Sequence, residues 1–342
     1  MAEAGLRRIP VVDARSAPFP AAFAAASRPE EVGRIIAMAR RRYTGLGLLL
    51  GDAVSRRWLA RNPSPLRAEI AAVAAAVGRP GATLLNLSYE WGCTCGIQAD
   101  AAPVMLRVLD WDLEGLGETL CVIRQSGPAG EWLHIGWPGL AGTITALAPG
   151  RFAIAINQPP LPLTRLGAAA RRAGLRVPGV LADWAAARPA AWRSRALPPA
   201  HLLRLVCDEA PDFATALARL RDTPLAAAAT FSLAGTAPGQ AAVVEREPGV
   251  QAVQEGAKLA AANHWSALST PGAPRWRESE PRAAWMTALL AADVPPDLSW
   301  MRPPLLNSGT RLAATMRPAD GALELAGFEG ERRVSEILRT PR

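Results

Sequence analysis

The chain has 342 residues, of which half are apolar and a fifth are charged, and its formal net charge is +8. This composition provides enough apolar surface for a sizeable core and excludes a disordered chain. Lys258 is the only lysine, so the positive charge comes from scattered arginines, with no zinc-finger spacing or basic-aromatic run beside them. We therefore expect a basic surface and no nucleic-acid partner.

The N-terminal part of the chain has a helical pattern. We predict helices at residues 30–43, 55–61 and 65–77, the last with apolar residues every three or four positions. No apolar run is long enough for a signal peptide or an integral membrane segment. The four cysteines are too few for a disulfide framework. These features favour a soluble, cytoplasmic protein.

The rest of the chain alternates between strand and helix patterns. Strands are predicted at residues 93–98, 104–109, 119–125, 132–137, 143–148 and 151–157, and again at 228–233, 241–245, 250–255 and 258–263. Helices are predicted at residues 178–187, 200–210, 211–221 and 280–292, and a closing hairpin at 311–316 and 322–328. Closely spaced strands imply antiparallel pairing. The order indicates an α+β sandwich of sheets flanked by helices.

Standard catalytic signatures are absent: there is no Walker loop, no His-Glu-x-x-His and no Gly-x-Ser-x-Gly. The three histidines are His134, His201 and His264, and no set of ligands has a useful metal spacing, so we expect neither a metal nor a cofactor. A Cys-His enzyme would need one of these histidines beside its nucleophile. The sequence leaves that arrangement open.

Two neighbouring segments carry a more specific pattern. The first runs from Asn86 through Tyr89, Glu90, Trp91 and Gly92 to Cys93-Thr94-Cys95, and the second contains Arg107-Val108-Leu109-Asp110-Trp111. They resemble acid ceramidase, N-acylethanolamine acid amidase and the choloylglycine hydrolases. Those N-terminal-nucleophile (Ntn) hydrolases have Asn-x-x-Tyr-Glu, then Cys-Thr-Ser at the start of the mature chain, then Arg-Asn-x-Asp.

The resemblance continues along the chain. Gly136-Trp137-Pro138-Gly139 is similar to the family's Gly-Tyr-x-Gly, and residues 149–157 to its strand ending in Asn, here Asn157. Asn263-His264-Trp265 is similar to its Thr-Asn motif, most closely in the penicillin acyltransferase branch. Ser279-Glu280-Pro281-Arg282 fits that branch's Ser-x-x-Arg, which selects Arg282 over Arg275 and Arg277.

The sequence departs from the family pattern at four places, which involve five residues. Cys95 replaces its Ser, Val108 its Asn, Thr236 the Asn of its Gly-Gly-Asn turn, and Gln158-Pro159 a charged pair after Asn157. Cys93, Arg107 and Asp110 remain in place. Because such neighbouring residues shape the substrate pocket, these departures leave the identity of the substrate undetermined.

The resemblance implies a four-layer αββα fold in which residues 1–92 form a helical prosegment or α chain and residues 93–342 the catalytic chain. It also implies self-cleavage between Gly92 and Cys93, followed by hydrolysis of a linear N-acyl amide through a thioester on Cys93. The sequence does not tell whether the cleaved segment stays bound or whether the protein forms a homo-oligomer.

The chemistry of such a site supports these assignments. A new α-amino group on Cys93, with an ordinary pKa near ~7.7–8, is a base attached to the nucleophile, so no histidine is needed. Arg107 on the neighbouring strand is expected to favour the thiolate. Asp110 is expected to orient the α-amino group, which requires a bend near Leu109 or a strand end to bring it inward, because residues three apart on a strand lie on opposite faces.

Several alternatives remain. Cys95 competes with Cys93 as the nucleophile, while Cys121 and Cys207 are expected in the core. Asn157 and Asn263 are candidate oxyanion donors or strand-end caps. Trp111, Trp137 and Trp265, with Trp91, are expected to line an acyl pocket or simply the core.

Other functions also remain open. An acyltransferase of the same fold would pass the acyl group to an amine, and a catalytically silent member would only bind an acyl ligand. A peripheral membrane protein is a weaker alternative, because no clear Lys/Arg face stands opposite bulky apolar residues in the basic helices before Cys93.

Overall fold

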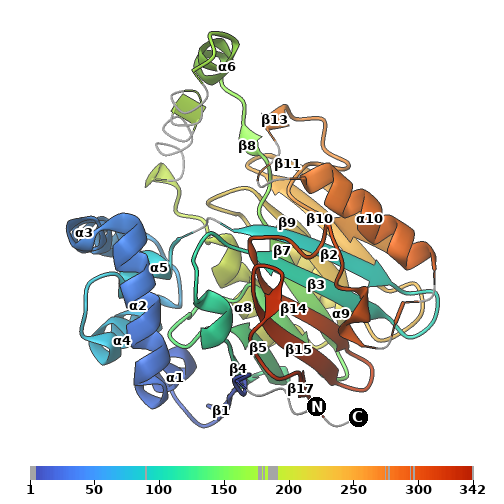
Figure 1. Ribbon diagram of the computed structural model, residues 1–342, viewed down its shortest axis with the longest axis horizontal. Helices are drawn as coiled ribbons and strands as arrows, with labels where there is room; N and C mark the ends of the chain where they lie inside the picture. The colour runs from blue at the N-terminus through green and yellow to red at the C-terminus, as the bar shows by residue number, and fades with distance from the viewer. Residues whose placement is uncertain are drawn as a thin grey trace.

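Two facing β-sheets form the centre of the molecule in the computed structural model (Figure 1). The structure describes residues 5–88, 91–175, 179, 182–183, 192–273, 275, 278–292, 294–295 and 297–340. In the described residues, the eight-stranded sheet has the order β1 (Val11–Asp13), β4 (Cys121–Gly127), β5 (Gly130–Gly136), β6 (Thr145–Ala148), β7 (Phe152–Asn157), β9 (Ala229–Ala234), β10 (Ala241–Glu247) and β11 (Val250–Glu255). All of its pairs are antiparallel except β1 with β4.

The second sheet contains the start of the predicted catalytic chain. Its order is β12 (Lys258–Ala261), β2 (Gly92–Gln98), β3 (Val104–Asp110), β14 (Thr310–Arg317), β15 (Ala322–Glu329) and β16 (Arg332–Arg333), with β17 (Leu338–Arg339) also pairing with β15. A separate small pair joins β8 (Leu161–Pro162) to β13 (Gly272–Ala273). The predicted closing hairpin corresponds to β14 and β15.

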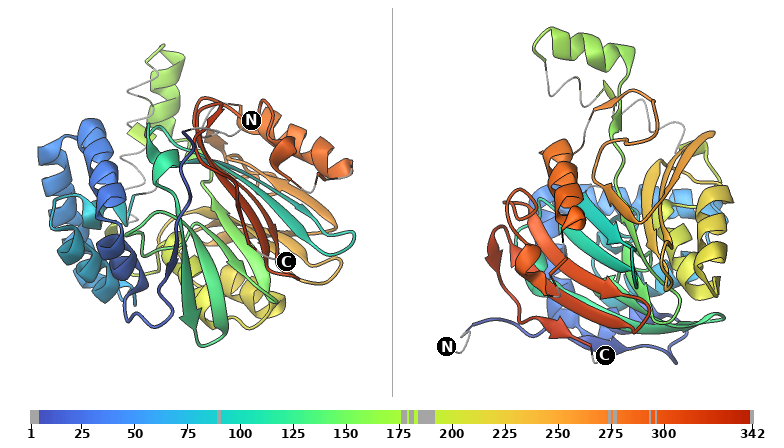
Figure 2. Two further views of the ribbon diagram at one scale, coloured as in Figure 1. Left: turned by 60° about the horizontal axis from the view of Figure 1, so that its bottom comes forward. Right: turned by 90° about the vertical axis from the view of Figure 1, so that its right-hand side faces the viewer.

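Helices cover the outer face of each sheet (Figure 2). Helices α8 (Pro199–Glu209) and α9 (Phe213–Asp222) pack on the eight-stranded sheet, and α10 (Ser279–Ala291) packs on β2 and β12 of the other. One apolar core lies between the sheets and a second lies under α10. Every residue of β3 and β7 is buried because both faces of these strands are covered. The predicted four-layer αββα sandwich is confirmed.

The N-terminal helices pack at one end of this sandwich (Figure 1). They are α1 (Pro20–Ser27), α2 (Pro29–Tyr43), α3 (Gly45–Arg61), α4 (Arg67–Val77) and α5 (Ala82–Leu85). Helix α3 begins ten residues before its predicted start, because Thr44 Oγ1 caps it by accepting the Gly47 N–H at 3.1 Å. Within the described residues, no helix is long and apolar enough to cross a membrane.

Some predicted bounds of helices and strands were wrong, and one predicted helix lies mostly outside the residues that the structure describes. Strand β1 and helix α1 were not predicted, and Thr119 belongs to the 3₁₀ helix η1 (Leu116–Thr119) rather than to a strand. A second such helix, η2 (Leu298–Trp300), precedes β14. Helix α6 (Arg165–Arg172) follows β8. Most of the predicted helix at residues 178–187 lies outside the described residues.

A close backbone contact joins η1 to β15. A Cβ on Gly117 would lie 2.0 Å from the carbonyl oxygen of Phe328, and one on Gly327 would lie 2.2 Å from the carbonyl oxygen of Gly117. Backbone atoms at such distances cannot yield without moving a strand. Both positions therefore require glycine.

We predict that Gly117→Ala destabilises the protein by about 1–3 kcal/mol or more, because the added methyl group overlaps backbone. Urea unfolding should show a lower midpoint. Gly256→Ala is the matched control, since its Cβ would meet only Leu259 Cδ2 at 3.8 Å. Equal midpoints for the two variants would contradict this packing.

Candidate active site

Cys93 lies fully buried near the start of β2, with its thiol directed between the two sheets. Arg107 Nη2 lies 2.9 Å from its Sγ, and the thiol points to the carbonyl oxygen of Ile156 at 3.6 Å. Arg107 stands opposite Cys95 in the β2–β3 register, and its Nη1 lies 3.3 Å from the Cys95 Sγ. The guanidinium also donates to Asn157 Oδ1. The buried guanidinium of Arg107 thus contacts the sulfurs of both Cys93 and Cys95.

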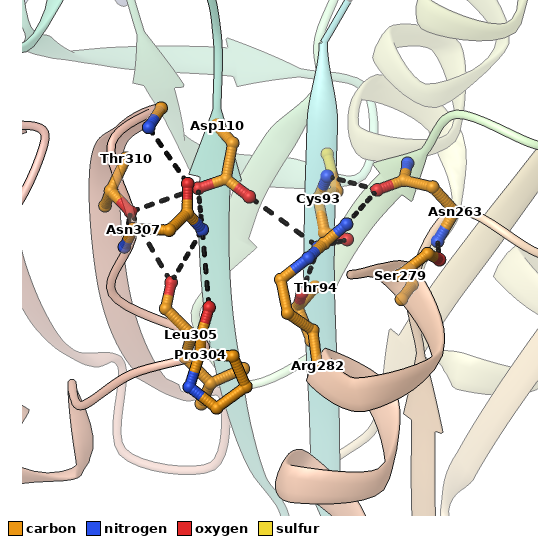
Figure 3. A network of polar contacts seen from close by, with 12 residues as sticks. Cys93, Thr94, Asp110, Asn263, Ser279, Arg282, Pro304, Leu305, Asn307 and Thr310 are labelled. Atoms are coloured by element: carbon orange, nitrogen blue, oxygen red, sulfur yellow. Dashed lines mark hydrogen bonds and ion pairs between the residues drawn. The ribbon is translucent and has the colours of Figure 1, made fainter. Parts of the chain in front are cut away.

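A second set of contacts holds the backbone of Cys93 (Figure 3). Its N–H donates to Asn263 Oδ1 at 2.8 Å, and its carbonyl oxygen accepts from Arg282 Nη1 at 2.7 Å. Arg282 Nη2 also donates to Asn263 Oδ1 at 2.9 Å. These contacts involve the backbone of Cys93 and not that of Cys95. The geometry therefore favours Cys93 over Cys95 as the candidate nucleophile.

Asp110 lies beside Arg282, Asn307 and Thr310 (Figure 3). Its Oδ2 is 3.6 Å from Arg282 Nη1, and its Oδ1 accepts from Asn307 Nδ2 at 3.2 Å and Thr310 Oγ1 at 3.1 Å. Asp110 is the last residue of β3, and the inward turn predicted there is not found. Strand alternation is kept, and Arg282 on α10 approaches Asp110 from the outer face.

The two asparagines are held by several contacts. Asn157 Nδ2 donates to the carbonyl oxygens of Ala261 and Ala262, and Asn263 Nδ2 donates to that of Gln158 at 2.9 Å. Their amides thus join strand ends of the two sheets, while their oxygens orient Arg107 and Arg282. A role as oxyanion donors stays a prediction.

Burial dominates the ionisation of the site. Desolvation raises the pKa of the Cys93 thiol to about 12, and the nearby charge of Arg107 only partly opposes it. Arg107 therefore favours the thiolate, as expected, but its effect on the thiol pKa is smaller than that of burial. Burial likewise raises the pKa of Asp110, although Arg282 opposes this, and burial lowers the pKa of Arg282.

Contacts from α10 and the loop before β14 complete the site. Ser279 Oγ accepts from the backbone N–H of Asn263 and pairs with His264 Nδ1, each at 2.8 Å. The Ser-x-x-Arg spacing already pointed to Ser279, whereas nothing in the sequence pointed to Asn307 or Thr310. Arg275 donates to the Pro159 carbonyl oxygen instead, and Arg277 lies outside the described residues.

The remaining cysteines and histidines have structural contacts elsewhere. Cys121 and Cys207 are buried in the core, as expected. His134 pairs with Thr143 at 3.2 Å and His201 with Ser64 at 2.7 Å. In the part of the chain that the structure describes, no three acidic, cysteine or histidine side chains are grouped to hold a metal ion.

An apolar cavity of about 70 Å³ lies between the N-terminal helices and the sandwich. Trp111 and Trp137 line it together with Ile35 and Ile36 of α2. The rings of Trp91, next to Gly92, and Trp111 have centroids 5.4 Å apart, and those of Trp111 and Trp137 are 5.7 Å apart. Trp265 does not line this cavity, and its place in an acyl pocket stays a prediction.

Comparison with solved structures identifies proteins with a similar fold. An N-acylethanolamine-hydrolyzing acid amidase (NAAA) ortholog from Caenorhabditis elegans matches with a TM-score of 0.50 and 13% identity, over 66% of this chain and 93% of that chain. Penicillin V acylase from Agrobacterium tumefaciens matches with a TM-score of 0.36 and 14% identity, over 69% and 83%. No protein-family model and no curated protein matches the sequence. The chain has the sandwich fold of the Ntn hydrolases.

We predict that Arg107→Gln slows alkylation of Cys93 at neutral pH, because losing the cation raises the thiol pKa further. At a pH below the thiol pKa, each unit by which that pKa rises lowers the thiolate fraction about tenfold. Peptide mapping after iodoacetamide treatment measures each cysteine separately. Cys121 and Cys207, which are buried away from Arg107, serve as internal references. An unchanged ratio of Cys93 to reference labelling would contradict the assignment.

Proposed function

We propose that this protein is a self-processed cysteine amidase that hydrolyses linear N-acyl amides through a thioester on Cys93. The observation that carries the proposal is that neighbouring side chains contact both the sulfur and the backbone of Cys93. Arg107 contacts its sulfur at 2.9 Å, while Asn263 and Arg282 hold its N–H and carbonyl oxygen. A cysteine that served only to fill the core would need neither two buried cations nor a fixed backbone.

Processing begins with attack of Cys93 Sγ on the carbonyl carbon of Gly92. The C–N bond breaks, the thiol proton ends on the Cys93 nitrogen, and Gly92 becomes a thioester. Water then hydrolyses this thioester, which releases a Gly92 carboxylate and restores the thiol. Because burial holds the thiol pKa near 12, the intact chain is a poor thiolate source and the step is expected to be slow.

Cleavage changes the acid–base chemistry of the site. The new α-amino group on Cys93 takes the thiol proton when Sγ attacks a substrate amide, and delivers it to the departing amine. Asp110 Oδ2 faces Arg282 and has no hydrogen-bond donor in the described structure, so we assign it to orient this group from the outer face. Arg107 supports the sulfur from the inner face.

We further propose that residues 1–92 stay bound to residues 93–342 after cleavage. Glu69 and Arg204 form a buried ion pair across the two parts at 3.8 Å, and Ser64 pairs with buried His201. Asn86 donates to the Gly139 carbonyl oxygen, and β1 adds an edge strand to the eight-stranded sheet. These contacts do not depend on the Gly92–Cys93 bond.

The apolar cavity supports an apolar acyl group as the part of the substrate that is recognised. Its aromatic wall continues from Trp111 to Trp91, which precedes the cleavage site by one residue. Transfer of methylene groups from water into such a cavity is favourable. An acyltransferase would use the same thioester but pass it to an amine, and a silent member would bind the acyl ligand without cleavage.

We predict that purified wild-type protein yields two fragments by denaturing mass spectrometry, with a new N-terminus at Cys93. Under native conditions the fragments should elute together. Cys93→Ala should remain intact, whereas Cys95→Ala should still be cut because its backbone lacks the contacts of Cys93. A single intact chain for active wild type, or loss of cleavage only in Cys95→Ala, would refute the assignment.

We predict that processed protein releases amine from a panel of N-acyl amides, with kcat/KM rising about fourfold per added methylene until the cavity is filled. Hydroxylamine should trap the thioester as an acyl hydroxamate. Ile35→Phe, which narrows the cavity, should move the preference to shorter chains and spare the acetyl amide.

Other outcomes of the panel separate the alternatives. Equal rates for all chain lengths would contradict the pocket. Acyl transfer to an added amine in preference to water would identify an acyltransferase. No turnover after clean processing would indicate the silent binder.

A further inference from the structure

A buried carboxylate on the eight-stranded sheet holds the loop that follows Asn263. Glu245 lies on β10 and is only 1% exposed. Its Oε1 accepts from the backbone N–H and the hydroxyl of Ser266, at 2.6 and 2.7 Å. Its Oε2 accepts from the backbone N–H groups of Ala267 and Leu268, at 3.0 and 2.8 Å. Both carboxylate oxygens thus fix three consecutive residues of one loop.

Two side chains of the eight-stranded sheet hold the chain on either side of Asn263. Asn157 and Glu245 lie in one cross-strand row, because each pairs in register with Thr230, and such partners share a face of the sheet. Asn157 donates to the two carbonyl oxygens just before Asn263, and Glu245 accepts from the loop just after it. Asn263 Oδ1 in turn accepts the Cys93 N–H at 2.8 Å. The row therefore leads to the nitrogen of Cys93.

We propose that Glu245 is a positioning residue for the reaction at Cys93, because it holds the loop that keeps Asn263 Oδ1 on the Cys93 nitrogen. The inference rests on the proposed function, in which that nitrogen becomes the base. Glu245 does not line the apolar cavity, so its effect on the reaction runs through the loop. A carboxylate suits the role because it accepts at both oxygens, whereas an amide would turn an N–H group toward the backbone N–H donors.

The first test is hydrogen exchange resolved by residue, measured in the Cys93→Ala chain. Residue 93 keeps its backbone N–H in that chain, so the result does not depend on processing or catalysis. Adding Glu245→Gln should speed exchange by about tenfold or more at residues 266–268 and also at residue 93, because the loop opens more often. Adding Glu247→Gln, two residues along the same strand, is the matched control and should change neither.

The second test is hydrolysis of an N-acyl amide by processed protein over a range of pH. Glu245→Gln should lower kcat by about ten- to a hundredfold with little change in KM, because the base is displaced while the cavity is intact. Asn263 Oδ1 favours the protonated α-amino group, so loosening it should lower the pKa of that group. The acidic limb of the kcat profile should therefore move to lower pH. Glu245→Asp keeps the carboxylate and should recover part of both effects.

The two tests separate this inference from the proposed function. Absence of amidase activity in wild type would refute the proposed function, while the exchange result would still decide whether Glu245 holds the backbone at residue 93. Faster exchange confined to residues 266–268 would make Glu245 a local anchor of the loop and overturn its positioning role. An unchanged kcat and pH profile in active Glu245→Gln protein would overturn it as well. If Glu245→Gln does not fold, Glu245→Asp should show smaller changes at the same places, and none at residue 93 would overturn the proposal.

Discussion

Two buried guanidinium groups hold the first residues of β2 from opposite faces, and the rest of the site depends on them. Arg107 lies between the sheets and meets the Cys93 sulfur, Asn157 and the Ile156 carbonyl oxygen. Arg282 belongs to α10 and meets the Cys93 carbonyl oxygen and Asp110. A buried charge costs several kcal/mol unless its partners surround it. Such partners exist only because one sheet faces the inner side of β2 and a helix covers its outer side.

A nucleophilic cysteine needs a cation that stabilises its thiolate and a base that removes its proton, and in this arrangement the two come from different sources. Burial keeps the thiol protonated and shielded in the intact chain, with a pKa of about 12, while the cation at 2.9 Å is already in place for a thiolate. The proposed cleavage supplies the missing base at the same residue. The fixed N–H and carbonyl oxygen of Cys93 would keep the surrounding backbone in position during the proposed cleavage.

The sequence was informative where the contacts are local and less so where they are not. Arg107 follows Cys93 across one hairpin, so strand pairing predicts that it lies near Cys93 and Cys95, and the register places it opposite Cys95. The partner of Asp110 could not be predicted in this way, because Arg282 comes from a helix far along the chain and approaches from the other face. Strand β1 has three residues and is defined by its neighbour β4, and the exposed leucines of α3 resemble core residues until burial is known.

The central claim is that Cys93 is both the new N-terminus and the acylated residue. Its most direct test is to incubate processed protein with an N-acyl amide, quench it in acid, and map the acylated peptide by mass spectrometry. The account predicts an acyl group in thioester linkage on a peptide that begins at Cys93. Acylation of Cys95, or of a peptide in which Gly92 still precedes Cys93, would contradict it.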